Sequence, residues 1–235
     1  MRAKIPWDRP SADRFTITDW EIDPARTALI IVDAQQCYVD PGKGVGPLLQ
    51  QEYPDIYGYY YPRLAETVIP NILRLQDFFR GNDLAVIYTR MGFQLPGARD
   101  LPPWNWRATQ LRGHDGNFFP RGSQEYELVA ELKPLPHELV LDKNSMGPFA
   151  STALDQLLRN MGIENLVVTG VLTNVAVEST ARDAGDRGYN PITVEDAIAA
   201  YRPAEHEDTL ANASWWVVKS TDEVVQTLGP LLTSA

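Results

Sequence analysis

The sequence has little cysteine and little histidine, which limits the metal and redox chemistry that it can support. Cys37 is the single cysteine in 235 residues. One thiol can form neither an internal disulfide nor a multi-cysteine zinc site. The three histidines, His114, His137 and His206, lack the spacing of metal ligands. We therefore expect no bound metal.

The chain also lacks a long apolar run and an excess of basic residues. No stretch of about 18 apolar residues is present, so we expect no membrane partner. The N-terminal stretch MRAKIPWDRPSADRF has no apolar core of the kind found in signal peptides, so we expect a cytoplasmic protein. The formal net charge of −10 argues against a nucleic-acid partner, because nucleic acids select basic surfaces.

What the chain does contain is an alternation of strand and helix patterns. Apolar runs predict strands over 27–33, 84–90, 138–142, 165–170, 191–195 and 214–218. Helical spacing predicts helices over 63–80, with a kink or break at Pro70, and over 151–161, 175–188, 203–213 and 221–228. Such alternation is typical of a Rossmann-like parallel sheet of about six strands in a three-layer α/β/α domain. We expect one domain over residues 1–235.

Two segments do not follow the alternation. Residues 92–122 are rich in Pro, Gly, Trp and Arg, and we interpret them as an ordered lid. Its aromatic residues, which either line a pocket or pack the lid, are Trp104, Trp106, Phe118 and Phe119. Arginines that could face a substrate carboxylate are Arg90, Arg107, Arg112 and Arg121. A tyrosine cluster, Tyr57 and Tyr59–Tyr61, is expected in an insertion before the first helix, as a subunit contact or a pocket wall.

Three features that could take part in a chemical reaction lie at the ends of predicted strands. Asp33 ends the first strand, Lys143 follows the third, and a Gly170–Ala176 turn follows the fourth. Carboxyl ends of parallel strands form the ligand site in open α/β sheets. An acid, a lysine and a strand-to-helix turn suit acyl transfer when the turn carries a thiol, because the helix N-terminus and a nearby ammonium both favour the thiolate. Ala176 occupies the position where that thiol would lie.

Three stretches carry a resemblance to a known family. They are IIVDAQQCY (30–38), LDKNSMGPFASTALDQLLRNMGI (141–163) and VTGVLTNVAVESTARDAGDRGY (168–189). Together they resemble the isochorismatase-like cysteine hydrolases, which include nicotinamidases and the N-carbamoylsarcosine, ureidoacrylate and biuret amidohydrolases. The similarity runs from about Thr27 to about Leu228. In amide-cleaving members the last stretch has cysteine at the position of Ala176.

The resemblance implies the isochorismatase-like fold and a role for each matched residue. Asp33 becomes the general acid/base, Lys143 its electrostatic partner and position 176 the nucleophile. A cis peptide is implied at Val171–Leu172, with the amides of Leu172 and Ala176 as the oxyanion hole. No cofactor is implied. Nicotinamidase-type members have an Asp-x-His…His metal site, and no such triplet follows Tyr53. A homo-oligomer, either dimer or tetramer, is the expected assembly.

Residues expected to bind a small amide or ureido substrate surround these three positions: Gln35, Cys37, Tyr38, Trp104, Phe149, Thr173 and Asn174. For some of them a structural role is also open. Cys37 could simply be a small buried apolar residue. Thr173 and Asn174 could cap the helix that follows them.

Two explanations of Ala176 stay open. One is an engineered replacement of the cysteine in a C–N hydrolase, giving a chain that binds substrate and barely reacts; the residues flanking position 176 favour it. The other is a natural member without the cysteine, such as an isochorismatase that cleaves a vinyl ether with Asp33 as general acid. A non-catalytic protein that binds a small ligand is a third possibility for the function.

Overall fold

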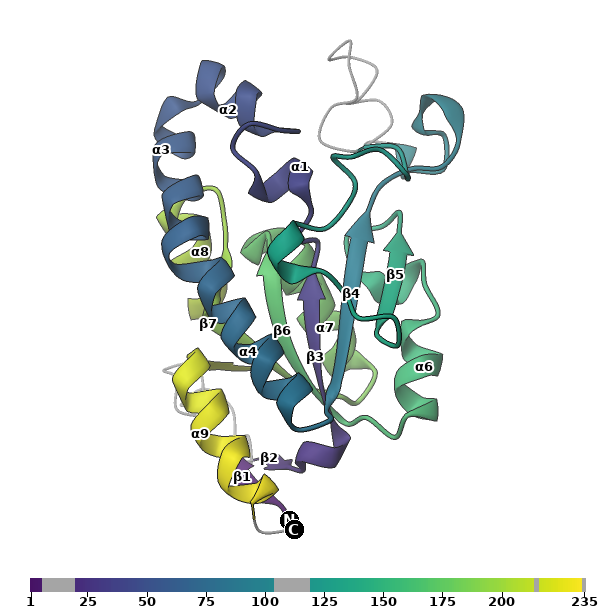
Figure 1. The fold of residues 1–235 in the computed structure, drawn as a ribbon, viewed down its shortest axis with the longest axis vertical. Coiled ribbons are helices and arrows are strands. Elements are labelled where there is room, and N and C mark those ends of the chain that lie inside the picture. Colours follow the sequence, from purple (N-terminus) through teal and green to yellow (C-terminus); the bar gives the residue numbers. More distant parts are fainter. Residues whose placement is uncertain (6–19, 104–118, 214–215, 234–235) are drawn as a thin grey trace.

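The fold is built on a six-stranded parallel sheet in the order β5-β4-β3-β6-β7-β8 (Figure 1). The computed structural model describes residues 1–5, 20–103, 119–213 and 216–233. The strands of the sheet are β3 (Thr27–Val32), β4 (Ala85–Met91), β5 (Leu139–Lys143), β6 (Asn165–Val171), β7 (Asn190–Ala199) and β8 (Val217–Lys219). A separate antiparallel pair, β1 (Ala3–Ile5) with β2 (Trp20–Ile22), was not predicted.

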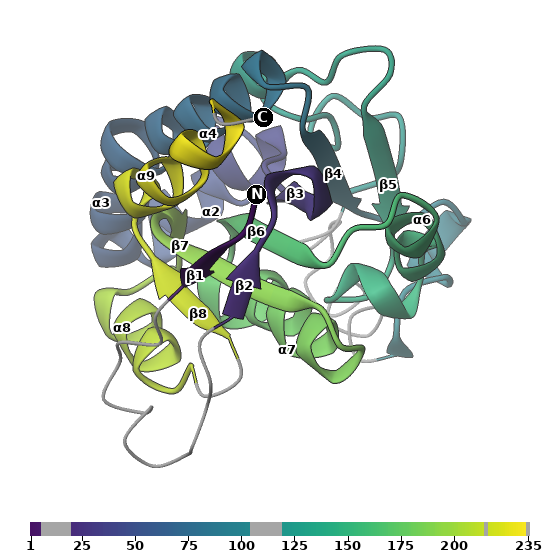
Figure 2. The same cartoon turned by 90° about the horizontal axis from the view of Figure 1, so that it is seen from below.

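Helices cover both faces of the sheet, which confirms the predicted three-layer architecture (Figure 2). The first face carries α3 (Pro54–Arg63), α4 (Ile69–Gly81) and α9 (Thr221–Leu232). The second carries α6 (Leu154–Asn160), α7 (Glu178–Asp186) and α8 (Pro203–Ala211). Alternate residues of β3 serve the two cores: Leu29 and Ile31 pack on the first face, and Ile30 and Val32 on the second. Two short helices, α1 (Gln36–Val39) and α2 (Gly46–Glu52), follow β3.

The helix predicted from residue 63 begins nine residues earlier, at Pro54. Helical structure runs through α3, a π-helical turn over Leu64–Val68, and α4. In that turn the amide of Ile69 bonds Leu64 O, five residues back, immediately before Pro70. Proline has no amide hydrogen to continue an α-helical ladder, but Pro70 lies in the first turn of α4 and the helical structure continues through it without a break. The tyrosine cluster consequently lies on α3, and its prediction as an insertion before the first helix is wrong.

The end of one strand also differs from prediction. β7 extends to Ala199, beyond the predicted end at residue 195. A register shift with its extra residues on β7 lets Ile198 and Ala199 pair with Gly170 and Val171. Of the predicted lid, residues 104–118 lie outside the described residues. Its two ends meet where the amide of Phe93 donates to Phe119 O (3.2 Å) and that of Arg121 donates to Phe93 O (2.8 Å).

No helix in the described ranges is long and apolar enough to cross a lipid bilayer.

Strands β3 and β6 approach closely where both end. Gly170 pairs with Val32, directly before Asp33. Its φ is +107°, and a Cβ added there would lie 2.0 Å from Val32 O. Only glycine allows this backbone conformation at this distance.

We expect Gly170→Ala to lower the free energy of unfolding by more than about 2 kcal/mol, because both φ and the contact with Val32 O forbid a Cβ. Gly58→Ala is the matched control. A Cβ on Gly58, within α3, meets nothing within 4 Å, so this change should raise stability by about 0.5–1 kcal/mol. Urea unfolding of both variants checks the pair. Equal effects would show that the approach of β3 to β6 is not constrained at Gly170.

Candidate active site

Asp33 lies at the carboxyl end of β3 and has a left-handed backbone, with φ of 50°. Its amide donates to Thr89 O on β4 (3.1 Å), and the Thr89 hydroxyl donates to Asp33 Oδ1 (2.7 Å). Asp33 is only 4% exposed. The neighbouring strand therefore fixes both the backbone and the carboxylate. Thr89 was missed by the sequence reasoning, although a polar residue within the apolar run AVIYTRM is a readable signal.

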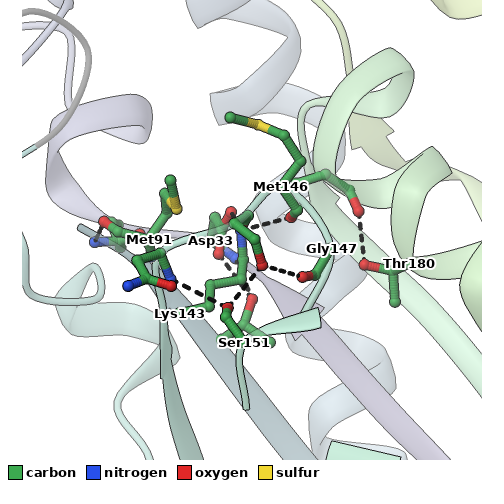
Figure 3. Close-up of polar contacts among 12 residues, drawn as sticks. Asp33, Met91, Lys143, Met146, Gly147, Ser151 and Thr180 are labelled. Atoms are coloured by element: carbon green, nitrogen blue, oxygen red, sulfur yellow. Dashed lines mark hydrogen bonds and ion pairs between the residues drawn. The ribbon is translucent and has the colours of Figure 1, made fainter. Parts of the chain in front are cut away.

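Lys143, the last residue of β5, forms a buried ion pair with Asp33 (Figure 3). Lys143 Nζ lies 2.7 Å from Asp33 Oδ2, and the lysine side chain is fully buried. Nζ also donates to Ser145 O (3.1 Å) and Met146 O (2.7 Å). An ammonium has three N–H donors, so all of them are used. The structure thus brings together two of the three predicted catalytic positions.

The loop after β5 supplies the carbonyls that bind Lys143, and its own side chains stabilise it. Ser145 Oγ donates to Gly147 O (2.7 Å) and shares a hydrogen bond with Ser151 Oγ (2.6 Å). Ser151 Oγ also accepts from the Asn144 amide (3.3 Å). Short side chains close to their own backbone suit such loop bonds. They hold the carbonyls of Ser145 and Met146 toward the ammonium.

Gln35 acts as a brace between three segments. Its Nε2 donates to Met91 O (3.1 Å) and Tyr126 O (2.7 Å), and its Oε1 accepts from the Met91 amide (2.7 Å). Both N–H donors of the amide are therefore used on backbone. Gln35 positions the segment that follows Asp33, and it has no N–H left for the substrate contact that we predicted.

The third predicted position lies in the turn after β6. The Val171–Leu172 peptide is cis, the bond that the resemblance indicated. A π-helical turn over Thr173–Val177 follows and leads into α7. The amides of Val175 and Val177 both donate to Leu172 O (3.1 and 3.2 Å). Ala176 lies between these two residues, in the first helical turn, where amides have few intrahelical acceptors.

Ala176 is 4% exposed and belongs to the core on the α6–α7–α8 side of the sheet. The Thr180 hydroxyl donates to Ala176 O (2.6 Å), which fixes the carbonyl side of this residue. Because β3 and β6 are neighbours, the turn and Asp33 share one edge of the sheet. The arrangement places first-turn amides and a buried carboxylate at adjacent strand ends.

Cys37 and Tyr38 lie on α1, which begins three residues after Asp33; Cys37 is fully buried and Tyr38 partly buried. Burial and then the negative charge of Asp33 hold the pKa of the Cys37 thiol well above its usual range. Burial, followed by the charges of Cys37 and Asp33, likewise raises the pKa of Tyr38. Both groups therefore stay protonated at neutral pH. Cys37 is a poor nucleophile in this setting, and Tyr38 keeps its phenolic hydrogen.

The other predicted substrate-binding residues are distributed differently. Phe149 is buried against Tyr189, with 5.9 Å between ring centroids, and the Arg187 guanidinium lies 5.3 Å from the Phe149 ring. Asn174 Oδ1 is buried without a hydrogen-bond partner among the described residues. Trp104 lies outside the described residues, as do Trp106, Phe118, Arg107 and Arg112. Their roles stay predictions.

The tyrosine cluster is packed inside the molecule. Tyr60 contacts Tyr61 (5.2 Å between ring centroids) and Tyr201 (5.0 Å), and Tyr57 contacts Tyr61 (4.9 Å). Tyr60 and Tyr61 are both buried. Their hydroxyls find no partner in the described part of the chain. Burial within one chain argues against a subunit contact for these two residues, which belong to the core on the first face of the sheet.

Elsewhere, metal ligands do not gather in the described ranges. No three side chains of His, Cys, Asp or Glu come together there as a possible metal site.

Comparison with known proteins finds one domain family and several relatives. The isochorismatase domain matches residues 27–226. A ureidoacrylate amidohydrolase, RutB, from Caulobacter segnis is 34% identical over 186 residues, which cover 75% of this chain and 73% of that protein.

Solved structures show the same architecture. A cysteine hydrolase from Pseudomonas syringae pv. phaseolicola superposes with a TM-score of 0.73 at 26% identity, covering 90% of this chain and 96% of the other. N-carbamoylsarcosine amidase from Thermoplasma acidophilum superposes with a TM-score of 0.63 at 25% identity, covering 84% of this chain and 97% of the other.

We expect Lys143→Met to lower the free energy of unfolding by about 3–5 kcal/mol, because it leaves the Asp33 carboxylate buried and unpaired. Adding Asp33→Asn removes the buried charge and should recover at least about 1 kcal/mol of that loss. Urea unfolding of the single and double variants measures both. A double variant less stable than Lys143→Met alone would contradict this account of the pair.

Proposed function

Because the chain belongs to the isochorismatase family, we propose that it is built to hydrolyse a C–N bond in a small carbamoyl or ureido compound. Relatives named for ureidoacrylate and N-carbamoylsarcosine support this class, since both names describe a carbamoyl group on nitrogen. The single observation that carries the proposal is the buried pair of Asp33 and Lys143 at 2.7 Å, at the strand edge that also holds the turn of Ala176. The substrate is a free small molecule.

In the proposed reaction a cysteine at position 176 supplies the nucleophile. Asp33 accepts the thiol proton as Sγ bonds to the substrate carbonyl carbon. The amides of Leu172 and residue 176 face the negative oxygen that develops. The C–N bond then breaks, the leaving nitrogen takes the proton from Asp33, and water hydrolyses the thioester. Lys143 orients the carboxylate and balances its charge.

The chain with Ala176 retains every proposed part except the sulfur. Its side chain has no lone pair to attack a carbonyl carbon, so we propose that this form binds substrate and barely turns it over. Asp33, Thr89 and Lys143 hold one another without help from position 176. The expected dimer or tetramer remains a prediction.

We expect Ala176→Cys to release ammonia or amine from ureido acids, while the Ala176 form releases none. Adding Asp33→Asn to the cysteine form should reduce the rate by at least about 100-fold, because the general acid/base is lost. The assay covers small amides, ureido acids, biuret-like compounds and isochorismate. Turnover of isochorismate by the Ala176 form would replace the proposal with vinyl-ether cleavage by Asp33. Ligand-induced thermal shifts with no turnover by either form would instead favour a binding protein.

Alkylation by iodoacetamide tests whether the turn activates a thiol, independently of any substrate. In Ala176→Cys the new thiol should react at least about tenfold faster than Cys37, because the helix N-terminus favours a thiolate whereas burial and Asp33 raise the pKa of Cys37. Peptide mapping by mass spectrometry measures both thiols in one sample. Slower alkylation at position 176 than at Cys37 would show that the turn does not activate a nucleophile.

A further inference from the structure

A buried polar chain runs from α3 through α8 to the turn that carries position 176. The Thr173 hydroxyl lies 3.0 Å from His206 Nδ1, and His206 Nε2 lies 3.1 Å from Arg63 Nη2. Thr173 is 1% exposed and His206 8%. Thr173 opens the turn, three residues before Ala176. Neither Arg63 nor His206 was considered from the sequence for this role.

Arg63 is itself held in place by strand β7. Its Nη2 also lies within hydrogen-bond distance of Glu195 O (3.0 Å) and Ile198 O (3.3 Å), so the two N–H groups of Nη2 are shared among three acceptors. Ile198 pairs with Gly170 on β6, directly before the cis peptide. The guanidinium is therefore anchored to the same strand ends that position the turn.

The chemistry of these groups fixes the direction of each hydrogen bond. A guanidinium has N–H donors and no acceptor, so His206 Nε2 must present its lone pair to Arg63. The neutral imidazole then carries its hydrogen on Nδ1 and donates it to Thr173 Oγ1. Thr173 Oγ1 is thus an acceptor from His206, and its own hydrogen is available for another acceptor.

Within the described ranges the Thr173 side chain has no hydrogen bond besides the one to His206. A buried hydroxyl hydrogen without an acceptor is costly. The next residue adds a complementary group, because Asn174 Oδ1 is a buried acceptor without a donor in the described structure. A carbamoyl group offers both counterparts, a carbonyl oxygen and N–H donors.

We propose that Arg63 and His206 are positioning residues that hold the Thr173 hydroxyl as a hydrogen-bond donor to an oxygen of the substrate. This role rests on the proposed function and deepens it, because it assigns recognition of a carbamoyl compound to Thr173. Asn174 Oδ1 accepts from the substrate nitrogen in the same arrangement.

Two substitutions of His206 separate this role from simple packing. In His206→Asn the side-chain N–H takes the place of Nδ1–H and keeps the donor to Thr173. In His206→Gln the carbonyl oxygen takes the place of Nε2, which keeps the acceptor for Arg63 and loses that donor. Packing alone would make the two variants equivalent.

In the Ala176→Cys background we expect His206→Asn to retain kcat/KM within about threefold of the parent. The kcat/KM of His206→Gln and of Thr173→Val should each fall by about 10- to 100-fold, the range for loss of one buried hydrogen bond. Thr173→Ser keeps the hydroxyl and should retain the activity. Thr209→Val is the matched control, because the Thr209 hydroxyl on α8 donates within its own helix, to Glu205 O (2.8 Å). The kcat/KM of Thr209→Val should stay within about twofold of that of the parent. Thermal midpoints of the two His206 variants should agree, so that stability does not explain the difference.

The imidazole tautomer gives a readout that needs no turnover. ¹⁵N NMR of the Ala176 chain, with the His206 signal assigned by its loss in His206→Asn, should show Nδ1–H. An Nε2–H tautomer, equal activity of the two His206 variants, or full activity of Thr173→Val would overturn the inference. If Ala176→Cys hydrolyses nothing, the proposed function fails, and the tautomer still decides the direction of the polar chain.

Discussion

The buried contact between Asp33 and Lys143 is the interaction on which the rest of the site depends. Two opposite charges removed from water are stable only when their remaining donors and acceptors are satisfied. Here Thr89 satisfies the second carboxylate oxygen, and the carbonyls of Ser145 and Met146 satisfy the ammonium. This requirement ties β3, β4 and the loop after β5 to one point. The pair is therefore a structural constraint and a proposed catalytic element at once.

A second constraint brings the turn of position 176 to that point. Gly170 lets β6 pass Val32 at a distance that no side chain tolerates. The strand then enters the turn at the edge of the sheet where Asp33 lies. The Asp33–Lys143 pair and the close approach of β6 to β3 act on neighbouring strands. A change in either therefore moves the proposed nucleophile and the proposed base relative to each other.

Periodicity predicted the six strands of the parallel sheet and the helices from α4 onward because each of these buried elements carries its own apolar pattern. It also placed Asp33 and Lys143 at the carboxyl ends of β3 and β5, the two strands that flank β4. The start of α3 was missed because PDIYGYYYPR contains two prolines and a glycine, residues that disfavour helices except where the first turn or tertiary packing accepts them. Thr89, His206 and Arg63 escaped notice for another reason. Their importance comes from partners 56, 33 and 143 residues away, and no local pattern contains such a pairing.

The structure also explains why a chain with Ala176 can keep the fold of a hydrolase. Asp33 and Lys143 are each required by the other, so neither can be removed without leaving a buried charge. The alanine at position 176 has no charge that needs a partner: its side chain packs in an apolar core, and its backbone carbonyl accepts from the Thr180 hydroxyl. A thiol there serves the proposed reaction and no structural need. Its absence removes a nucleophile and leaves the surrounding polar groups in place, including Thr173 with the positioning residues His206 and Arg63, to hold the proposed ligand.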